Sequence, residues 1–566
     1  MKLIVFSMFG DYANPYLDLG LPTTHIQISA RPGKVDIAVD THLDGHFVRE
    51  LKTQVARVAL PVLQAEILKI LRDQRDDALI VYLHEERVYP GVADLILASG
   101  IPYVFGFDEK CRMPWSQRHF VGSARDRICF KEDAQDVFKR SYLFDCDVIQ
   151  KDDEATLLDR LKRCGSRERL VPLERSTSSK NHNVLLLSYY YSPALTVAVH
   201  RVRFWKENMA RVAKEALGAS APNIQTQVLT ACESYQNDTR NLVVPDRAQI
   251  DAQGTREHVV QSRLAAARVN WTAVYWSAHI RRWFEQHPDA HFDTVIMSGN
   301  PFFYFGLSEY FKERFGAKVI LDFRDPFANN PRFTYSIAHK SLVEELEDNY
   351  LDTSDAALAV NTMCLRALRL LPGQKSAVIA NGFDESVVDE IKPKPIPNDN
   401  GRAKFIYTGK FYADRDASAL VKAMNPDKHR FLHIGWQSDA DDHLDDYPAM
   451  ERLGVMDYPE VVAHCKSADA GVIFASGDAF EQTTKIFDYL AADIDIIIVT
   501  DGAIEYGNLH EMTADLDGIY WVRNTERGIA KFVKNYTPKR RRRPQRARFS
   551  RGAATENLVR LMLDKD

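Results

Sequence analysis

Two aspartates flank an arginine at the end of a predicted buried strand. An apolar run ends in Asp322, Arg324 and Asp325. The next residue, Pro326, lacks the backbone N–H that a continuing strand would need. Arg324 can hold a phosphate or another anion, while the two carboxylates orient it or accept from hydroxyl groups of a ligand. The three side chains can instead satisfy one another as a structural ion-pair network, and both alternatives remain open.

Further charged residues follow a second predicted strand. Lys410 comes directly after Gly409 at the end of an apolar run, and Arg415 lies five residues further on. Two cations in one loop can converge on an anionic group such as a phosphate. Lys485 and Asp488 lie on one predicted helix. The alternative is a solvated loop and an ordinary Lys/Asp pair on a helix surface.

The elements that must position these residues alternate along the chain. Short apolar runs are followed by amphipathic runs of helix length, which indicates the α/β class. Helices are predicted over 51–73, 91–99, 132–140 and 153–163. Strands are predicted over 1–8, 78–83, 102–107, 127–130, 183–193, 293–299, 317–323, 356–360, 376–381, 404–411, 430–435, 470–475 and 495–501.

Polar segments divide the chain into three predicted α/β units. Residues 1–164 form an accessory N-terminal α/β domain, followed by a serine- and arginine-rich linker over 165–182. Two Rossmann-like domains follow over 183–395 and 402–535, separated by a Pro/Asn/Gly-rich stretch. The remainder, 536–566, is a basic segment with a closing helix. Each of the three units is long enough to bury a core of its own.

Ligands of open parallel sheets bind at the carboxyl ends of the strands. Polar or glycine-bearing ends occur at Asp322, at Ser298-Gly299-Asn300-Pro301, in the turn from Asn381 to Asp384, and at Gly409. These four ends are spread over the two Rossmann-like domains. The sequence therefore predicts a single cleft between two sheets.

Composition sets limits on compartment and partners. The chain has 45% apolar and 27% charged residues and a formal net charge of −5, so no overall attraction to nucleic acid or membrane is expected. Its seven cysteines are odd in number and form no C-x-x-C pair, which favours reduced thiols and a cytoplasmic location. The first residues are typical of a buried strand rather than a signal peptide, and no apolar run is long enough to span a membrane.

Six motifs occur in an order that resembles one enzyme family. They read YYYSPALTVAVHRVRFW, SGNPFFYFGL, VILDFRDPF, VIANGFD, FIYTGKFYADRD and TTKIFDYLAADIDIIIV. Over 183–566 they resemble the GT-B glycosyltransferases of the family-four type, which use nucleotide sugars. The resemblance implies two Rossmann-like domains that face a cleft, a nucleotide-sugar co-substrate, no metal cofactor, and transfer with retention.

The resemblance also implies roles for single residues. It makes Lys410 and Arg415 a diphosphate clamp and lets Asp488 accept from ribose hydroxyls. The remaining implied donor contacts are Lys485, Asn381, Asp384 and Gly409, and the implied acceptor or phosphate loop contains Ser192, Pro193 and Thr196. Asp322, Arg324 and Asp325 are the catalytic candidates at the mouth of the cleft.

The sequence departs from the family pattern at two places. The paired glycines of the acceptor loop are replaced by Ala194-Leu195, and an aspartate, Asp488, stands where a glutamate is usual. The glutamate expected eight residues earlier is Phe480, with Glu481 adjacent but off register. These changes leave open a catalytically inactive GT-B scaffold or glycan-binding module.

Two basic segments bear on partners. Residues 539–551 carry eight basic side chains and no acidic one, and a predicted helix over 200–214 carries five basic residues with two aromatics. Both suit peripheral contact with the anionic inner face of a membrane, or a solvated linker in the first case. The expected acceptor is a glycan or lipid-linked acceptor of polysaccharide biosynthesis. The alternative is DNA, modified by a sugar transferase whose basic segment binds phosphates.

Overall fold

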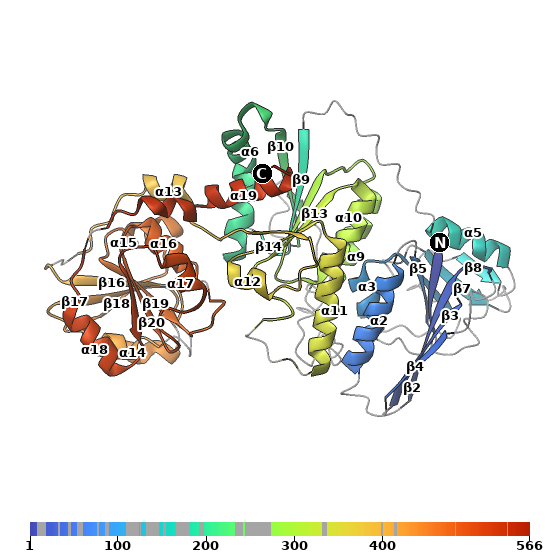
Figure 1. The fold of residues 1–566 in the computed structure, drawn as a ribbon, viewed down its shortest axis with the longest axis horizontal. Coiled ribbons are helices and arrows are strands. Elements are labelled where there is room, and N and C mark those ends of the chain that lie inside the picture. The colour runs from blue at the N-terminus through green and yellow to red at the C-terminus, as the bar shows by residue number, and fades with distance from the viewer. Residues whose placement is uncertain are drawn as a thin grey trace. The chain divides into compact units, whose positions relative to one another are not determined.

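The computed structural model describes the chain in separate ranges. These are residues 1–7, 19–31, 34–42, 47–53, 60–75, 78–84, 90–108, 124, 126–131, 147–150, 154–165, 181–191, 197–231, 241–243, 273–330, 335, 337–397, 400–411, 416–437, 439–481, 483–539 and 541–565. They form three sheets flanked by helices (Figure 1). The α/β class predicted from the sequence is confirmed. The predicted linker over 165–182 lies almost entirely outside these ranges.

The first sheet has eight strands in the order β4-β3-β2-β1-β5-β6-β7-β8. Its strands are β1 (Lys2–Ser7), β2 (Thr23–Arg31), β3 (Lys34–His42), β4 (Phe47–Thr53), β5 (Ala78–His84), β6 (Tyr103–Asp108), β7 (Asp126–Lys131) and β8 (Asp147–Gln150). Pairing is parallel except along β2-β3-β4. The helices of this part are α2 (Leu60–Gln74), α3 (Pro90–Ser99) and α5 (Glu154–Gly165).

One expected helix of this first part is wrong in its extent. The prediction over 51–73 includes the end of β4, and α2 begins only at Leu60. The antiparallel strands β2 and β3 were not predicted either. Their polar and apolar residues alternate with the period of a strand that has one buried face, which a search for continuous apolar runs does not detect.

The second sheet has seven strands in the order β11-β10-β9-β12-β13-β14-β15. They are β9 (Asn181–Ser188), β10 (Asn223–Thr230), β11 (Asn241–Val243), β12 (Thr294–Ser298), β13 (Lys318–Phe323), β14 (Ala356–Ala359) and β15 (Lys375–Val378). Its helices are α6 (Val197–Leu217), α9 (Val274–Gln286), α10 (Ser308–Phe315), α11 (Ile337–Thr353) and α12 (Thr362–Ala367), with the 3-10 turns η4 (Gly218–Ser220) and η6 (Phe303–Leu307).

The third sheet has six parallel strands in the order β18-β17-β16-β19-β20-β21. They are β16 (Ala403–Thr408), β17 (His429–Ile434), β18 (Met450–Gly454), β19 (Ala470–Ala475), β20 (Asp495–Thr500) and β21 (Ile519–Arg523). The surrounding helices are α13 (Glu385–Glu390), α14 (Ser418–Ala423), α15 (Tyr458–Cys465), α16 (Lys485–Ala491), α17 (Gly507–Thr513), α18 (Glu526–Asn535) and α19 (Arg551–Met562), with η7 (Asp439–Asp446) and η8 (Pro544–Phe549).

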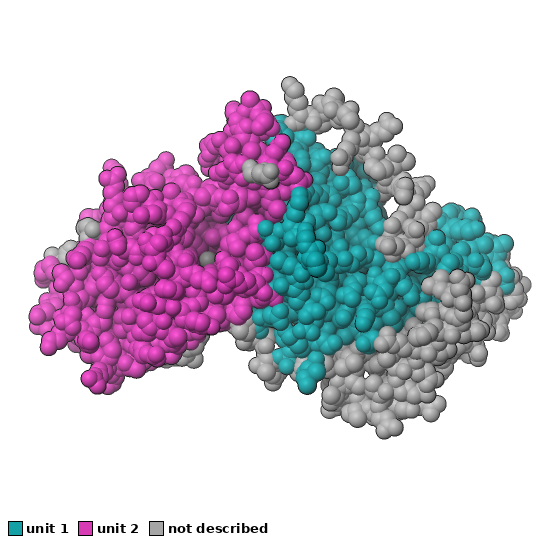
Figure 2. Space-filling view, in the orientation of Figure 1, with its two compact units in different colours: residues 1–202, 222–358, 368–376 teal, residues 203–221, 359–367, 377–566 magenta. Residues whose placement is uncertain are grey.

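The described chain divides into two compact units (Figure 2). Unit 1 comprises Met1–Val202, Pro222–Leu358 and Leu368–Ser376, and unit 2 comprises Arg203–Ala221, Ala359–Ala367 and Ala377–Asp566. The first sheet therefore shares a unit with most of the second sheet. The domain boundaries predicted from the sequence, and the independent folding of residues 1–164, stay predictions.

Helix α2 of the first part lies against α11 of the second part within unit 1. Arg72 lies 3.2 Å from Glu345, and Arg75 donates to Asp352 at 2.8 Å. Elsewhere between the two parts, Gly100 and Gly306 approach so closely that a Cβ on Gly100 would overlap the Gly306 carbonyl. The two parts thus meet through ion pairs and close backbone contact.

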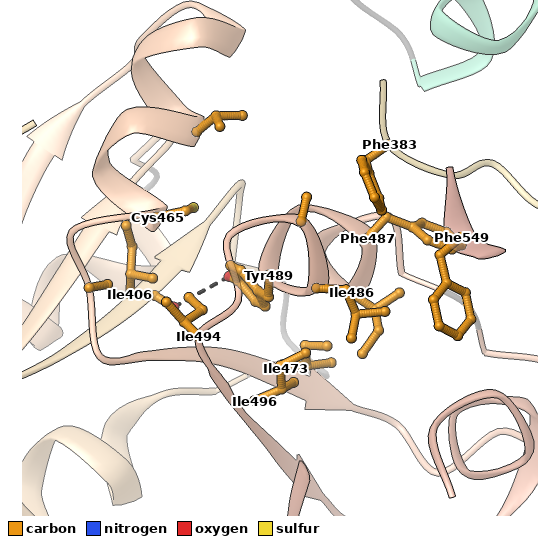
Figure 3. Packing of buried hydrophobic residues seen from close by; sticks show 14 of the residues in the cluster. Phe383, Ile406, Cys465, Ile473, Ile486, Phe487, Tyr489, Ile494, Ile496 and Phe549 are labelled. Atoms are coloured by element: carbon orange, nitrogen blue, oxygen red, sulfur yellow. Dashed lines mark hydrogen bonds between the residues drawn. The ribbon is translucent and has the colours of Figure 1, made fainter. Parts of the chain in front are cut away.

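Strand alternation places two cores on the two faces of the third sheet. On one face, Ile406, Ile473 and Ile496 pack with α15, α16 and α17 (Figure 3). On the other face, alternate residues such as Phe405 and Tyr407 pack with α14 and α18. Both faces are therefore covered, as parallel sheets require, and the ends of the strands are the places left for a ligand.

Tyr489 anchors α16 to the sheet. Its hydroxyl donates to the carbonyls of Ile406 and Val472 at 3.3 Å, and the Thr408 N–H lies 3.3 Å from it. Its ring lies so close to Gly471 of β19 that any Cβ there would overlap the ring. The glycine is needed for this close approach, and the approach fixes the position of the first turn of α16.

We expect Gly471→Ala to lower the free energy of unfolding by about 1–3 kcal/mol, because the added methyl group must displace a fully buried aromatic ring. Urea unfolding followed by circular dichroism measures the change. Gly454→Ala is a partial control, since its Cβ meets no atom, although its positive φ of 80° adds backbone strain of its own. A Gly471→Ala variant as stable as the wild type would show that α16 packs differently.

Candidate active site

The carboxyl ends of β16 and β17 form a tight glycine pair. Gly409 follows β16 with φ of 110°, and its N–H donates to the Ile434 carbonyl at 2.7 Å. A Cβ on Gly435, which follows β17, would overlap the backbone of Gly409. Side chains are thus excluded from both strand ends, and both glycines are only partly buried.

Lys485, the first residue of α16, reaches the same loop. Its Nζ lies 5.0 Å from the centre of the Tyr407 ring and 3.2 Å from the point where a Cβ on Gly409 would stand. Lys410 is exposed, and its carbonyl accepts from the Tyr407 hydroxyl at 3.0 Å. Lys485, which is distant in the sequence, therefore reaches the strand end that carries Gly409 and Lys410. Arg415, the other predicted clamp residue, lies outside the described residues.

A buried histidine, His433, forms a hydrogen bond with this loop. His433 Nε2 lies 2.7 Å from the Gly409 carbonyl, and its Nδ1 lies 2.9 Å from Arg452 Nη1. An arginine can only donate, so Nδ1 accepts and Nε2 carries the proton. Burial lowers the pKa of His433, which favours this neutral form. Arg452 is in turn paired with Asp441 at 3.1 Å, so the histidine has a positioning role.

Asp488 lies on α16, about one helical turn after Lys485. It is partly buried, and its Oδ1 accepts from the Tyr458 hydroxyl at 2.9 Å. Burial raises the pKa of Asp488 to about 6, although Tyr458 and the charges of Arg551 and Lys485 oppose the shift. The carboxyl group therefore changes its charge close to neutral pH, and Tyr458 is a partner that the sequence did not reveal.

The raised pKa of Asp488 predicts a pH dependence of stability. Its folded-state pKa exceeds the unfolded value, so the folded state holds the extra proton between about pH 4 and pH 6. Stability from this group is present below pH 4 and is lost as the pH rises through 6. We expect Asp488→Asn to become more stable relative to the wild type by about 1–2 kcal/mol between pH 4 and pH 7. Urea unfolding at several pH values measures this; a pH-independent difference between the two proteins would contradict it.

The loop after β19 is held by a buried glutamate. Glu481 is buried, and its Oε2 accepts from the N–H and hydroxyl of Ser476 at 2.8 and 3.1 Å. Phe480, at the position where the family glutamate was sought, contributes its carbonyl to Asn361 at 3.3 Å. Glu481 was noted in the sequence as off register, and the structure gives it a role in shaping this loop.

Trp436 is a feature of this edge that sequence reasoning missed. It follows Gly435 at the end of β17, and 65% of its surface is exposed. Val455, at the end of the neighbouring strand β18, is also exposed. The sequence offered one signal for it, a tryptophan next to a glycine at the end of the predicted strand 430–435. Such a ring can stack on a planar ligand.

In unit 1, the catalytic candidates do not pair with one another as a trio. Asp322, which is fully buried, accepts from Arg201 Nη2 at 2.7 Å and from the Ser298 hydroxyl at 2.8 Å. Arg324 donates to the carbonyls of Gly299 and Asn300, the latter at 2.9 Å. Asp325 is partly buried and has no hydrogen-bond or ion-pair partner among the described residues.

Arg201 was expected on a basic helix surface, but it is only 3% exposed. The period of α6 turns it towards the end of β13, where it neutralises Asp322. The buried ion pair, rather than a mutual Asp-Arg-Asp network, is therefore the structural feature at this strand end. The roles of Asp322, Arg324 and Asp325 in catalysis remain a prediction.

The other predicted ligand contacts either form hydrogen bonds within the protein or lie outside the described residues. Asp384 caps α13 by accepting from the Ser386 N–H and hydroxyl at 3.2 and 2.6 Å. The carbonyl of Asn381 accepts from Arg551 at 3.2 Å. Ser192, Pro193 and Thr196 fall outside the described residues. A helix cap suits Asp384, and ligand contact by it is not needed to explain its position.

The basic segment is largely paired within unit 2. Arg541 lies 2.7 Å from Asp495, Arg546 lies 2.9 Å from Asp389, and Arg548 lies 2.5 Å from Asp515. Arg543 donates to the carbonyls of Asp517 and Ile494, both at 2.9 Å. Much of the charge expected to face a membrane or DNA therefore fastens the C-terminal segment to the third sheet.

Helix α6 is also less basic than its sequence indicated. Arg203 pairs with Glu207 and Arg211 with Glu215, each at 2.9 Å and each four residues along the helix.

Among the described helices, none combines the length and apolar character needed to cross a membrane. The described residues also contain no group of three or more potential metal ligands.

No protein-family model matches the chain, and no curated protein matches it in sequence. Among solved structures, it is similar to a sucrose-phosphate synthase from Thermosynechococcus elongatus, with 12% identity, a TM-score of 0.43, and coverage of 68% of this chain and 97% of that one. It is also similar to the apo form of the lipopolysaccharide outer core galactosyltransferase WaaB, with 13% identity, a TM-score of 0.44, and coverage of 68% and 99%.

A third similar structure is an α,α-trehalose-phosphate synthase (UDP-forming) from Burkholderia xenovorans, with 12% identity, a TM-score of 0.43, and coverage of 67% and 100%. At these identities the likeness concerns the fold and assigns no role to a single residue.

Proposed function

We propose that this protein is a glycosyltransferase that moves a sugar from a nucleotide-sugar donor to a glycan or lipid-linked acceptor. The observation that carries the proposal is the convergence of Lys485, Gly409 and Lys410 at the carboxyl edge of the third sheet. A partly exposed strand end without side chains at its glycines and with two lysines nearby suits a diphosphate, and the sequence motifs around these residues resemble those of nucleotide-sugar enzymes.

In the proposed reaction, this edge of the third sheet stabilises the diphosphate leaving group. When the bond from the anomeric carbon to the diphosphate breaks, negative charge builds up on the phosphate oxygens. Lysines 410 and 485 can donate charge-assisted hydrogen bonds to those oxygens, and fixed donors stabilise developing charge without reorganisation. We propose that this replaces a divalent metal, and that transfer proceeds with retention of anomeric configuration.

The nucleoside half of the donor would lie along the same edge. Asp488, held by Tyr458, offers a carboxylate oxygen to ribose hydroxyls, and it does so best when ionised, above about pH 6. Trp436 offers an exposed ring on which a nucleobase can stack. These assignments place the diphosphate at Lys485, the ribose at Asp488 and the base at Trp436.

Acceptor recognition is proposed for the end of β13 in unit 1. Arg324 and Asp325 are both partly exposed there, so a charged or hydroxylated acceptor can reach them. Asp322 is proposed to act through Arg201 and the fold rather than by touching substrate. Peripheral contact with an anionic membrane through 200–214 and 539–551 is also proposed, and it would have to use the basic residues that remain, since most described arginines there are already paired.

A panel of UDP-, GDP- and ADP-linked sugars tests the proposal by thermal shift and by assay of donor hydrolysis, each with and without EDTA. We expect one nucleotide class to raise the unfolding temperature and to be hydrolysed slowly, with unchanged rates in EDTA. Binding without turnover on any acceptor would support an inactive scaffold. Duplex DNA as the sole working acceptor would support a DNA-modifying enzyme, and activity restored only by manganese would contradict metal independence.

A further inference from the structure

A cavity of about 740 Å³ opens at the edge of the third sheet opposite the candidate donor site. Its walls come from the first residues of β16 and β17 and from the carboxyl-terminal turns of α14 and α18. Strands β16 and β17 run in parallel, so their amino ends lie here and their carboxyl ends carry Gly409 and Gly435. The volume is in the range of sites for small molecules.

The lining of this cavity is rich in cations. Its charged residues are Arg402, Lys404, Lys428, Lys534 and one acid, Asp469. Asp469 is already used within the fold, because its Oδ2 accepts from the Lys404 backbone N–H at 2.8 Å and lies 3.4 Å from the Lys404 Nζ. Lys428 and Lys534 have no ion-pair partner among the described residues.

A buried histidine adds a neutral donor. His429 is only 9% exposed, and its Nδ1 accepts from the Asn425 N–H at 3.1 Å. The ring proton is therefore on Nε2, which makes no hydrogen bond to any described residue although the histidine lines the cavity. Burial and the nearby Lys428 lower the pKa of His429, so the ring stays neutral with this donor available.

Helix dipoles offer a competing explanation for part of this pattern. Lys534 lies in the last turn of α18, where a cation is favourable beside unpaired carbonyls. That explanation does not extend to Lys428, which precedes β17, or to the Nε2 donor of His429. A cavity with several donors and only one carboxylate, itself occupied, is complementary to a ligand that carries several acceptor oxygens.

We propose that this cavity binds a soluble phosphorylated small molecule with two or more negative charges, at a site separate from the donor site. Lys428 and Lys534 contact its charged oxygens, and His429 donates to an oxygen at the buried end. The proposal does not depend on the identity of the sugar donor, since no residue assigned to donor binding lines the cavity.

Isothermal titration of the full chain with a hexose bisphosphate, and with inorganic pyrophosphate, tests the site at a constant ionic strength of about 0.15 M. We expect one saturable site for the bisphosphate in the wild type. The double variant Lys428→Gln/Lys534→Gln should weaken binding about tenfold or more, as the loss of charged hydrogen bonds implies. Lys531→Gln, an exposed lysine on α18 outside the lining, should bind as the wild type does.

Two further variants separate this site from others. His429→Phe keeps a ring against Phe405 but removes the donor, and it should weaken binding while thermal unfolding confirms that the protein is folded. Lys485→Gln should leave bisphosphate binding unchanged, even if it weakens pyrophosphate at the donor site. Absence of bisphosphate binding to the wild type, equal binding by the double variant, or loss of binding only in Lys485→Gln would each overturn the proposal.

Discussion

Arg201→Met is expected to lower the free energy of unfolding by about 3–5 kcal/mol, because it leaves the Asp322 carboxylate buried without its cation. The two groups are 2.7 Å apart and almost completely shielded from water. Burial lowers the pKa of Arg201, and Asp322 opposes that shift. The attraction between the two charges thus offsets the free-energy cost of removing both groups from water. Either charge buried without its partner would be strongly destabilising.

Urea unfolding of four proteins measures this effect. Arg203→Met is the matched control, since Arg203 forms an exposed pair on the same helix and should cost less than about 1 kcal/mol. The double variant Arg201→Met/Asp322→Leu should recover most of the lost stability, because well-packed apolar groups often replace a buried ion pair without loss. An Arg201→Met protein as stable as Arg203→Met would show that the pair is not buried in solution.

The same double variant also separates structure from catalysis at Asp322. A folded double variant that retains donor hydrolysis would show that the aspartate acts through the fold. A folded double variant without activity would make Asp322 a direct participant.

Lys485→Gln is expected to weaken binding of the nucleotide-sugar donor about 10- to 100-fold, because a charge-assisted hydrogen bond to the diphosphate is lost. Glutamine keeps much of the length of the side chain and its packing on Tyr407. The fold should therefore survive, and both the affinity and the hydrolysis rate should fall. Titration calorimetry and single-turnover hydrolysis measure the two quantities.

Lys422→Gln is the control for Lys485. It removes an exposed lysine of the same unit whose partner is Glu526, so donor binding should not change. Lys410→Gln should act in the same direction as Lys485→Gln if both lysines face one diphosphate. Full donor affinity in Lys485→Gln would mean that the donor binds elsewhere.

The sequence predicted four strands of the third sheet, β16, β17, β19 and β20, but not β18 or β21. The ligand edge of this sheet stays a prediction. Continuous apolar runs such as those of β16, β19 and β20 are typical of parallel strands covered on both faces. The predicted bounds of β19 and β20 agree with the structure to within one residue, whereas β16 ends three residues earlier than predicted. The glycine after β16 and the lysine at the start of α16 were also recognisable, because both belong to a motif with fixed spacing.

Partners from distant parts of the chain could not be predicted in the same way. Arg201 and Asp322 are 121 residues apart, and nothing local distinguishes Arg201 from the paired surface arginines that follow it on α6. Tyr458 and Asp488 likewise meet only because α15 and α16 pack side by side. The charge of 539–551 was visible, but its carboxylate partners lie at scattered positions of the third sheet and its helices.

Hydrogen exchange of the full chain, with and without the nucleotide sugar that binds best in the panel, tests the central claim most directly. The account predicts that bound donor slows exchange at residues 408–411 and 484–488, where Gly409, Lys410 and Lys485 converge, and that this protection is lost in Lys485→Gln. Protection confined to unit 1, or to the cavity at the opposite edge of the third sheet, with none at these two segments, would contradict it.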